Sequence, residues 1–139
     1  MTELTRKERG MRVYRIEHLD TMPFFSGYGM VVLPAINKLG FRFAQIHTNI
    51  DMMVQSAVLS SRMFGFDSVV VPYDMTAESQ ALGNEISLYD NSEDILYPTI
   101  PEKRWQTLEE IEIPDNILEL GRIPMILEAI KLAKQQAPE

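Results

Sequence analysis

The sequence contains no cysteine and only two histidines among its 139 residues. Without cysteine, neither a disulfide framework nor a thiolate metal site can exist within this chain. His18 and His47 have no nearby partner at the spacing of a metal-ligand motif, so the sequence predicts no metal site. No apolar run approaches the roughly 20 residues that cross a bilayer, which predicts no membrane-spanning helix.

Basic residues are also scarce, with 13 Lys and Arg against 20 Asp and Glu, for a formal net charge of −7. An acidic surface repels a phosphate backbone, so nucleic acid is not an expected partner. The polar opening "MTELTRKERG" lacks the apolar centre of a secretory signal, and we expect a cytoplasmic location. The remaining composition, 45% hydrophobic and 24% charged, is typical of a folded globular domain.

Helical periodicity is clearest between Asn49 and Gly65. Apolar residues there recur at steps of three, four, seven and eight, which places them on one helix face. Asn49 is a typical N-cap and Gly65 a typical stop. Thr5 and Glu8 form a capping-box pattern at the start of an earlier helix. The predicted helices cover about residues 6–16, 30–40, 49–64, 75–82 and 123–135.

Two short apolar runs, residues 22–26 and 68–71, predict buried strands. Alternating apolar and polar residues within "EISLYDNSEDILYPTI", residues 85–100, predict a β-hairpin. Buried strands separated by amphipathic helices indicate an α/β fold with a parallel sheet. Since two such strands do not complete a sheet, the sequence predicts that residues 1–139 form one incomplete domain, the opening part of a larger α/β unit.

Asp74 is the residue in this pattern whose chemistry needs an explanation, because it follows the buried run 68–71 almost at once. A carboxylate in that position can hold a substrate. It is equally well placed to cap the helix predicted over 75–82, with Gly83 as its stop. The residues alone leave both roles open.

Three stretches of the chain resemble the uroporphyrinogen decarboxylase superfamily, which includes cobalamin-dependent methyltransferases. "GFDSVVVPYDMTAESQALGNEI" is similar to its second strand and the segment that follows. "TRKERGMRVYRIEHLDTMPFFSG" resembles its N-terminal helix and first strand, and "LGRIPMILEAIKLAK" the helix before its third strand. The resemblance implies a (β/α)₈ barrel. Such barrels need about 250 residues, so this chain would be the N-terminal portion of one, with an inserted β-hairpin.

The resemblance also implies where a site would lie, because active sites of these barrels sit at the carboxyl ends of the strands. It predicts Asp74 as a catalytic carboxylate at the mouth. Tyr73 would bind substrate beside it, with Ser26, Gly27 and Tyr28 opposite.

The segment after the first predicted strand separates the branches of the superfamily. The decarboxylases carry an arginine-rich stretch there that grips the carboxylates of their substrate. Here no Arg or Lys occurs between Phe24 and Ile36, and a tetracarboxylate needs cationic partners. The comparison favours the methyltransferase branch, which moves a methyl group between a corrinoid, methylcobalamin, and a thiol such as coenzyme M.

The resemblance implies a corrinoid and a zinc ion for a full-length protein, and a corrinoid protein or a tetrapyrrole-like molecule as partner. It implies no cofactor for this chain alone, because the His-x-Cys pair and later Cys that hold the zinc are absent. A tetrapyrrole decarboxylase is the alternative within the superfamily. The alternative of another class is a non-catalytic half-barrel whose exposed edges make it a homo-oligomer or a partner-binding module.

Overall fold

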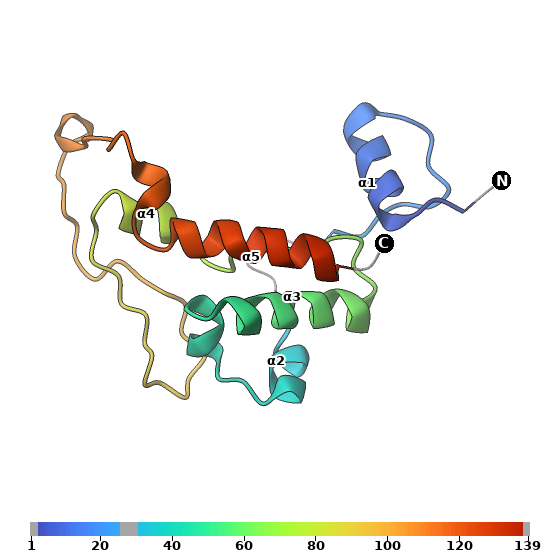
Figure 1. The fold of residues 1–139 in the computed structure, drawn as a ribbon, viewed down its shortest axis with the longest axis horizontal. Coiled ribbons are helices and arrows are strands. Elements are labelled where there is room, and N and C mark those ends of the chain that lie inside the picture. Colours follow the sequence, from blue (N-terminus) through green and yellow to red (C-terminus); the bar gives the residue numbers. More distant parts are fainter. Residues whose placement is uncertain (1–2, 26–30, 138–139) are drawn as a thin grey trace.

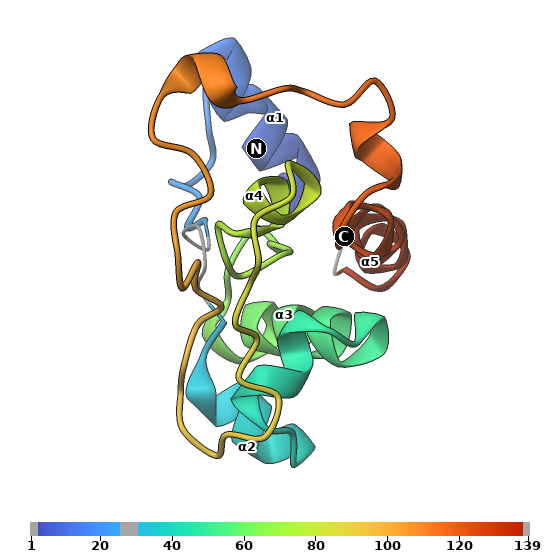
Figure 2. The ribbon, with the colours of Figure 1, turned by 90° about the vertical axis from the view of Figure 1, so that its left-hand side faces the viewer.

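A computed structural model describes residues 3–25 and 31–137 of the chain. Figures 1 and 2 both show α5 lying beside α3, and Figure 1 shows α1 beyond one end of this pair. Within the described ranges, none of the helices is both long enough and apolar enough to cross a membrane. The α-helices are α1 (Arg6–Arg15), α2 (Leu33–Leu39), α3 (Ile50–Phe64), α4 (Ala77–Ala81) and α5 (Ile123–Gln136), and the 3₁₀ helices are η1 (Phe43–His47), η2 (Leu108–Glu110) and η3 (Ile117–Glu119).

The predicted caps of α1 and α3 are confirmed. At α1, the Thr5 hydroxyl accepts from the Glu8 amide at 3.2 Å, and the Glu8 carboxylate accepts from the Thr5 amide at 2.9 Å. At α3, the Asn49 side chain accepts from the Met52 amide at 3.0 Å. Gly65 ends α3 with φ 71°, a left-handed conformation that favours glycine.

The core lies between α3 and α5, with α2 and η1 packed on α3. Small side chains on α5, Ala129 and Ala133, are buried there and allow the two helices to approach closely. Leu127 and Ile130, on the same helix, are less than half exposed, at 41% and 46%. The main contributors from α3 are Met53, Val54, Ala57 and Val58, and those from α2 and η1 are Ile36, Phe43 and Ile46.

The two predicted strands do not appear as β-strands in the part of the chain that the structure describes, and residue 26 lies outside it. The segments nevertheless meet. The Asp67 amide donates to the Phe24 carbonyl at 2.8 Å, and the Asp67 carboxylate accepts from the Phe24 amide at 2.8 Å. A β-strand requires a ladder of backbone hydrogen bonds with a neighbour. A single backbone bond between the segments does not make one.

The predicted hairpin is likewise not confirmed. One isolated antiparallel bridge joins Ser87 to Thr99, with amide-to-carbonyl distances of 2.9 and 3.2 Å. Both residues lie within the predicted stretch 85–100. A hairpin needs a ladder of such pairs between two strands, and one bridge does not make a ladder.

A partly buried ion-pair cluster fixes α1 to these segments. Arg9 donates to both oxygens of Asp20, at 3.0 and 3.1 Å, and to Asp67 at 2.8 Å. The hydrogen bonds from Arg9 and from the Leu4 amide hold the pKa of the Asp20 carboxyl well below its usual range. The cluster therefore ties the helix to the start of the segment that leads to Asp74.

Candidate functional site

Asp74 lies in a buried polar network, only 4% exposed, in the turn before α4. Arg122 reaches it from the start of α5. Nη1 of Arg122 donates to Oδ2 of Asp74 and Nη2 donates to Oδ1, both at 3.0 Å. Two parallel bonds of this kind give the strongest and most directional form of ion pair between side chains.

Every N–H of the Arg122 guanidinium has an acceptor. Besides the two bonds to Asp74, Nε donates to Gln80 Oε1 at 2.8 Å and Nη1 donates to the His47 carbonyl at 3.2 Å. The fifth bond runs from Nη2 to the Thr76 hydroxyl at 2.7 Å. Arg122 therefore joins α5, α4 and the end of η1 at one point.

Asp74 does not cap α4 in the way the sequence predicts, and α4 begins later than residue 75. The N-cap is Thr76. Asp74 Oδ1 accepts from the Thr76 amide at 2.9 Å and from its hydroxyl at 2.6 Å. A short carboxylate that bonds the backbone two residues ahead makes an Asx turn, which competes with the helical conformation and delays the start of the helix.

His47, at the end of η1, is fully buried beside the carboxylate. Its Nδ1 lies 3.3 Å from Asp74 Oδ2. An ionised carboxylate only accepts, so we assign the proton of this contact to Nδ1. Nε2 has no hydrogen-bond partner among the described residues. The ring packs edge-on against aromatic side chains of Phe43, Tyr73 and Tyr97.

Tyr73 is buried in the core, and its hydroxyl donates to the Met53 carbonyl in α3. Burial raises the pKa of the phenol well above its usual range, so Tyr73 is neutral. The other three predicted substrate-binding residues, Ser26, Gly27 and Tyr28, lie outside the described residues. The binding roles of all four residues stay predictions.

The electrostatics of the network favour an ionised Asp74. Burial by itself raises the pKa of its carboxyl, but the hydrogen bonds from His47, Arg122 and Thr76 outweigh burial and leave the pKa well below the usual range. An ionised Asp74 can accept hydrogen bonds and hold cations in place. It cannot give up a proton at neutral pH, which excludes it as a general acid in this arrangement.

Two members of the network, Arg122 and His47, are not among the site residues predicted from the sequence, and both are buried. The signal for Arg122 was its position at the N-cap of α5. A cation is unfavourable at the positive end of a helix dipole, so an arginine there needs a carboxylate nearby.

No group of three or more His, Asp or Glu side chains within residues 3–25 and 31–137 could hold a metal ion.

The family model described as "Uroporphyrinogen decarboxylase (URO-D)" matches residues 5–139.

Curated relatives cover nearly all of this chain. A methylcobamide:CoM methyltransferase, MtaA, from Methanosarcina barkeri is 26% identical over 136 residues, which is 98% of this chain and 40% of the relative. A methylcobamide:CoM methyltransferase, MtbA, from Methanosarcina mazei is 29% identical over 137 residues, with the same coverage. The chain spans about 40% of the length of the curated relatives it matches.

A solved structure supports the same relationship. The fold matches a methyltransferase from Methanosarcina mazei with a TM-score of 0.85 and 27% identity. The match covers 99% of this chain and 40% of that structure.

Proposed function

This chain belongs to the uroporphyrinogen decarboxylase family, and from that premise we propose that it is the N-terminal part of a methyltransferase acting between a corrinoid and a thiol such as coenzyme M. The observation that carries the proposal is that the curated relatives are methylcobamide:CoM methyltransferases matching over 98% of the chain. The absence of Arg and Lys between Phe24 and Ile36 supports it against a tetrapyrrole decarboxylase.

In the proposed reaction, the methyl group passes from the cobalt of a methylcobamide to the sulfur of the thiol. The cobalt–carbon bond would break and leave its electron pair on the cobalt, a sulfur–carbon bond would form with a pair from the sulfur, and the thiol proton would be released. The reaction belongs to the whole protein. For this part of it, the proposal assigns residues 22–26 and 68–71 to the first and second strands of a (β/α)₈ barrel, a role that the described residues, which form no β-strand there, do not show. The hydrogen bonds between Asp67 and Phe24 support their neighbouring positions.

The role we assign to Asp74 is to position its neighbours at the carboxyl end of the second strand. Its oxygens already accept from Arg122, Thr76 and His47, which supports this role more directly than contact with substrate. Direct catalytic contact, with Tyr73 beside it and the segment 26–28 opposite, remains the prediction from the resemblance.

The residues of this chain do not fit a zinc site. The sequence has no cysteine, and the described ranges offer no cluster of ligands. The proposal therefore assigns no zinc ligand to this chain and takes no step through the metal. Zinc and corrinoid binding would fall to other residues of a full-length protein.

The experiment that tests the proposal is a chimera in which this chain replaces the matching segment of the Methanosarcina barkeri methyltransferase. We expect the chimera to transfer methyl groups from methylcobalamin to coenzyme M. The change in the absorption spectrum of the corrinoid measures this transfer. A control chimera carries the corresponding segment of a uroporphyrinogen decarboxylase. A folded chimera that lacks transfer, or one that decarboxylates uroporphyrinogen, contradicts the proposal.

A non-catalytic partner-binding module is the second candidate. Large apolar side chains of Met22, Phe24 and Met75 are exposed, and exposed apolar surface favours association. An inactive but folded chimera, together with salt-resistant association of the isolated chain, would favour this function instead.

A further inference from the structure

His47 contacts both members of the buried ion pair between Asp74 and Arg122. Its Nδ1 lies 3.3 Å from Asp74 Oδ2, and its backbone carbonyl accepts from Arg122 Nη1 at 3.2 Å. Thr76 also contacts both members, but it belongs to the same turn as Asp74, whereas His47 is 27 residues away in the sequence. The side chain of His47 is therefore the contact that fixes the carboxylate to η1.

Three aromatic rings hold the imidazole ring of His47 in one orientation. Phe43, four residues earlier in η1, approaches edge-on with ring centroids 5.1 Å apart. Tyr73, which directly precedes Asp74, approaches edge-on at 6.2 Å, and Tyr97, from the segment after α4, does so at 5.9 Å. Edge-to-face packing at these separations is favourable and directional. The plane of the imidazole is thereby fixed, with Nδ1 facing the carboxylate.

His47 is too deeply buried to touch a substrate. Its exposed fraction is 0%, and Nε2 has no hydrogen-bond partner among the described residues. A side chain that these residues cover completely stays covered in a longer protein that holds them in this arrangement. Any effect of the imidazole on chemistry at the mouth must therefore pass through the group that it bonds, the carboxylate of Asp74.

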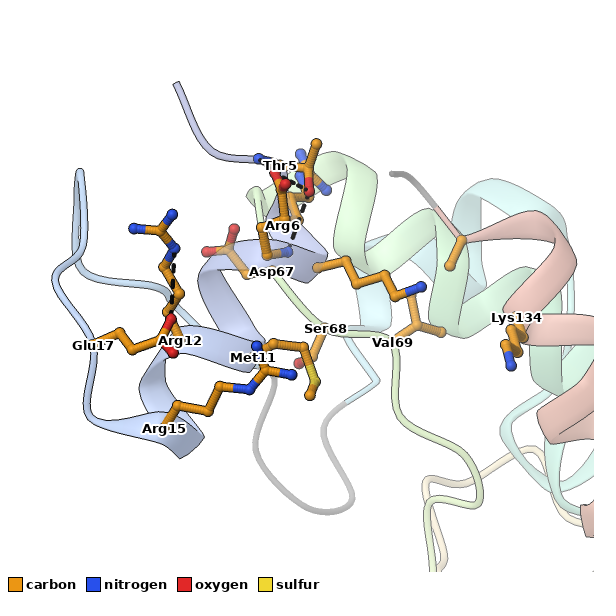
Figure 3. A pocket seen from close by; sticks show the side chains of 13 residues that line it. Thr5, Arg6, Met11, Arg12, Arg15, Glu17, Asp67, Ser68, Val69 and Lys134 are labelled. Atoms are coloured by element: carbon orange, nitrogen blue, oxygen red, sulfur yellow. Dashed lines mark hydrogen bonds and ion pairs between the residues drawn. The ribbon is translucent and has the colours of Figure 1, made fainter. Parts of the chain in front are cut away.

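A groove of about 940 Å³, shown in Figure 3, gives no access to this ring. The groove lies between α1, the segment 67–69 and the end of α5, and none of its lining residues belongs to the Asp74 network. Figure 1 shows α1 beyond one end of the pair formed by α3 and α5, and α4 near the other end. The role of His47 thus depends on its buried contacts alone.

The two oxygens of Asp74 accept from partners on different segments. Oδ1 accepts from Thr76 and from Arg122 Nη2, whereas Oδ2 accepts from Arg122 Nη1 and from His47. A carboxylate turns readily about its last torsion, so its orientation depends on donors at both oxygens. Burial raises the pKa of the Asp74 carboxyl, and the bond from His47 is among those that bring it below the usual range.

We propose that His47 is a positioning residue, whose Nδ1–H group holds the carboxylate of Asp74 in the orientation that methyl transfer requires. The inference rests on the proposed function, because it concerns the same reaction. It adds the side chain on which the orientation of Asp74 depends and the nitrogen that must carry a proton. Nδ1 must donate, because an ionised carboxylate only accepts hydrogen bonds.

Two amide substitutions, made in the chimera with the Methanosarcina barkeri methyltransferase, separate the role of Nδ1 from that of packing. The amide nitrogen of Asn is bonded to Cγ, as Nδ1 of His is, whereas that of Gln lies one bond further out, near the position of Nε2. His47→Asn can therefore donate to Asp74, and His47→Gln places its amide past the carboxylate. We expect H47Q to lower kcat about 10- to 100-fold, the effect of one lost hydrogen bond to a charged group. H47N should keep kcat within about three-fold, and both variants should keep the KM for coenzyme M within about two-fold, because His47 touches no substrate.

Ile46→Ala is the control for a purely structural effect. Ile46 is fully buried beside His47 in η1 and packs into the apolar core. We expect I46A to lower the urea midpoint of the chimera at least as much as H47Q does and to keep kcat within about two-fold. Circular dichroism checks that each variant is folded. Equal kcat values for H47N and H47Q, or a loss of kcat in I46A as large as in H47Q, overturns the proposal.

Nitrogen NMR of the unaltered chimera, labelled in its histidines, provides a measurement that needs no active variant. The signals of His47 are those that disappear in H47N or H47Q. We expect Nδ1 to carry a proton, and a ring protonated at Nε2 alone overturns the proposal. A folded, unaltered chimera without methyl transfer rejects the proposed function, and with it a role of His47 in that reaction. The nitrogen spectrum then still decides whether His47 holds Asp74.

Discussion

Arg122 and Asp74, 48 residues apart in the sequence, form a buried ion pair with two hydrogen bonds of 3.0 Å each. The pair connects the N-cap residue of α5 to the turn that follows the second predicted strand. Because the guanidinium also bonds Gln80 and the His47 carbonyl, displacement of any one of these segments disturbs the others. The relative placement of α4, η1 and α5 therefore depends on this pair.

Replacement of Arg122 by alanine should lower the free energy of unfolding by about 3–5 kcal/mol, since it leaves an uncompensated buried carboxylate. Arg122→Lys should also destabilise the protein, because an ammonium cannot make two parallel bonds. Urea unfolding followed by circular dichroism measures both. Lys131→Ala removes an exposed ion pair with Glu128 and should cost less than about 1 kcal/mol. Equal losses for Arg122→Ala and Lys131→Ala would argue against a structural role for the buried pair.

A double-mutant cycle tests whether Asp74 and Arg122 act as a unit. Asp74→Asn leaves the charge of Arg122 without its carboxylate partner. Arg122→Met leaves the carboxylate of Asp74 without its guanidinium partner. The double variant contains neither charge, so it should lose less stability than the sum of the two single variants, by at least about 1 kcal/mol. Additive losses in urea unfolding would mean that the two side chains contribute independently.

The lowered pKa values of Asp74 and Asp20 predict how stability depends on acid. When the folded pKa lies below the unfolded one, about 3.9, the contribution is complete above that value and is lost as pH falls towards the folded pKa. The urea midpoint should therefore decline below about pH 5. Asp74→Asn should flatten the decline, and Asp115→Asn, which changes an exposed carboxylate, should not. An unchanged acid profile in Asp74→Asn contradicts the prediction.

The raised pKa of Tyr73 predicts that the stability of the protein also falls at high pH. Burial raises the pKa of its phenol, so the unfolded chain ionises first and stability falls as pH rises above about 10. Tyr73→Phe should lose about 1–3 kcal/mol at neutral pH, because the buried Met53 carbonyl loses its donor. The same variant should show a weaker alkaline decline than the unaltered chain in urea unfolding. A steeper decline in Tyr73→Phe would show that another group controls it.

The sequence predicted the helices well because their signals are local. Asn49, Gly65 and the spacing of apolar residues between them define α3 without reference to the rest of the chain. The predicted strands were not found, because a strand depends on a partner segment that periodicity does not identify. The network around Asp74 was missed for the same reason. Its members His47 and Arg122 come from distant parts of the sequence. The one local signal for the network was the positive charge of Arg122 at the N-terminal end of α5, where a cation is unfavourable without a carboxylate nearby.

Gly121, which directly precedes Arg122, gives a prediction about how close α4 and α5 can come. Its φ is 55°, and a Cβ atom there would lie 3.1 Å from the Ala81 backbone nitrogen. Gly121→Ala should therefore cost more than about 1 kcal/mol, from the left-handed backbone and from the contact together. Gly40→Ala is the matched control, because Gly40 has φ 69° and no atom within 4 Å of the added carbon. Urea unfolding of both variants separates the two contributions. Of these two positions, only Gly121 has the close contact with α4. If Gly121→Ala lowers the free energy of unfolding no more than Gly40→Ala does, α4 can move away from Gly121 without cost. The position of Arg122 would then not depend on the close approach of α4.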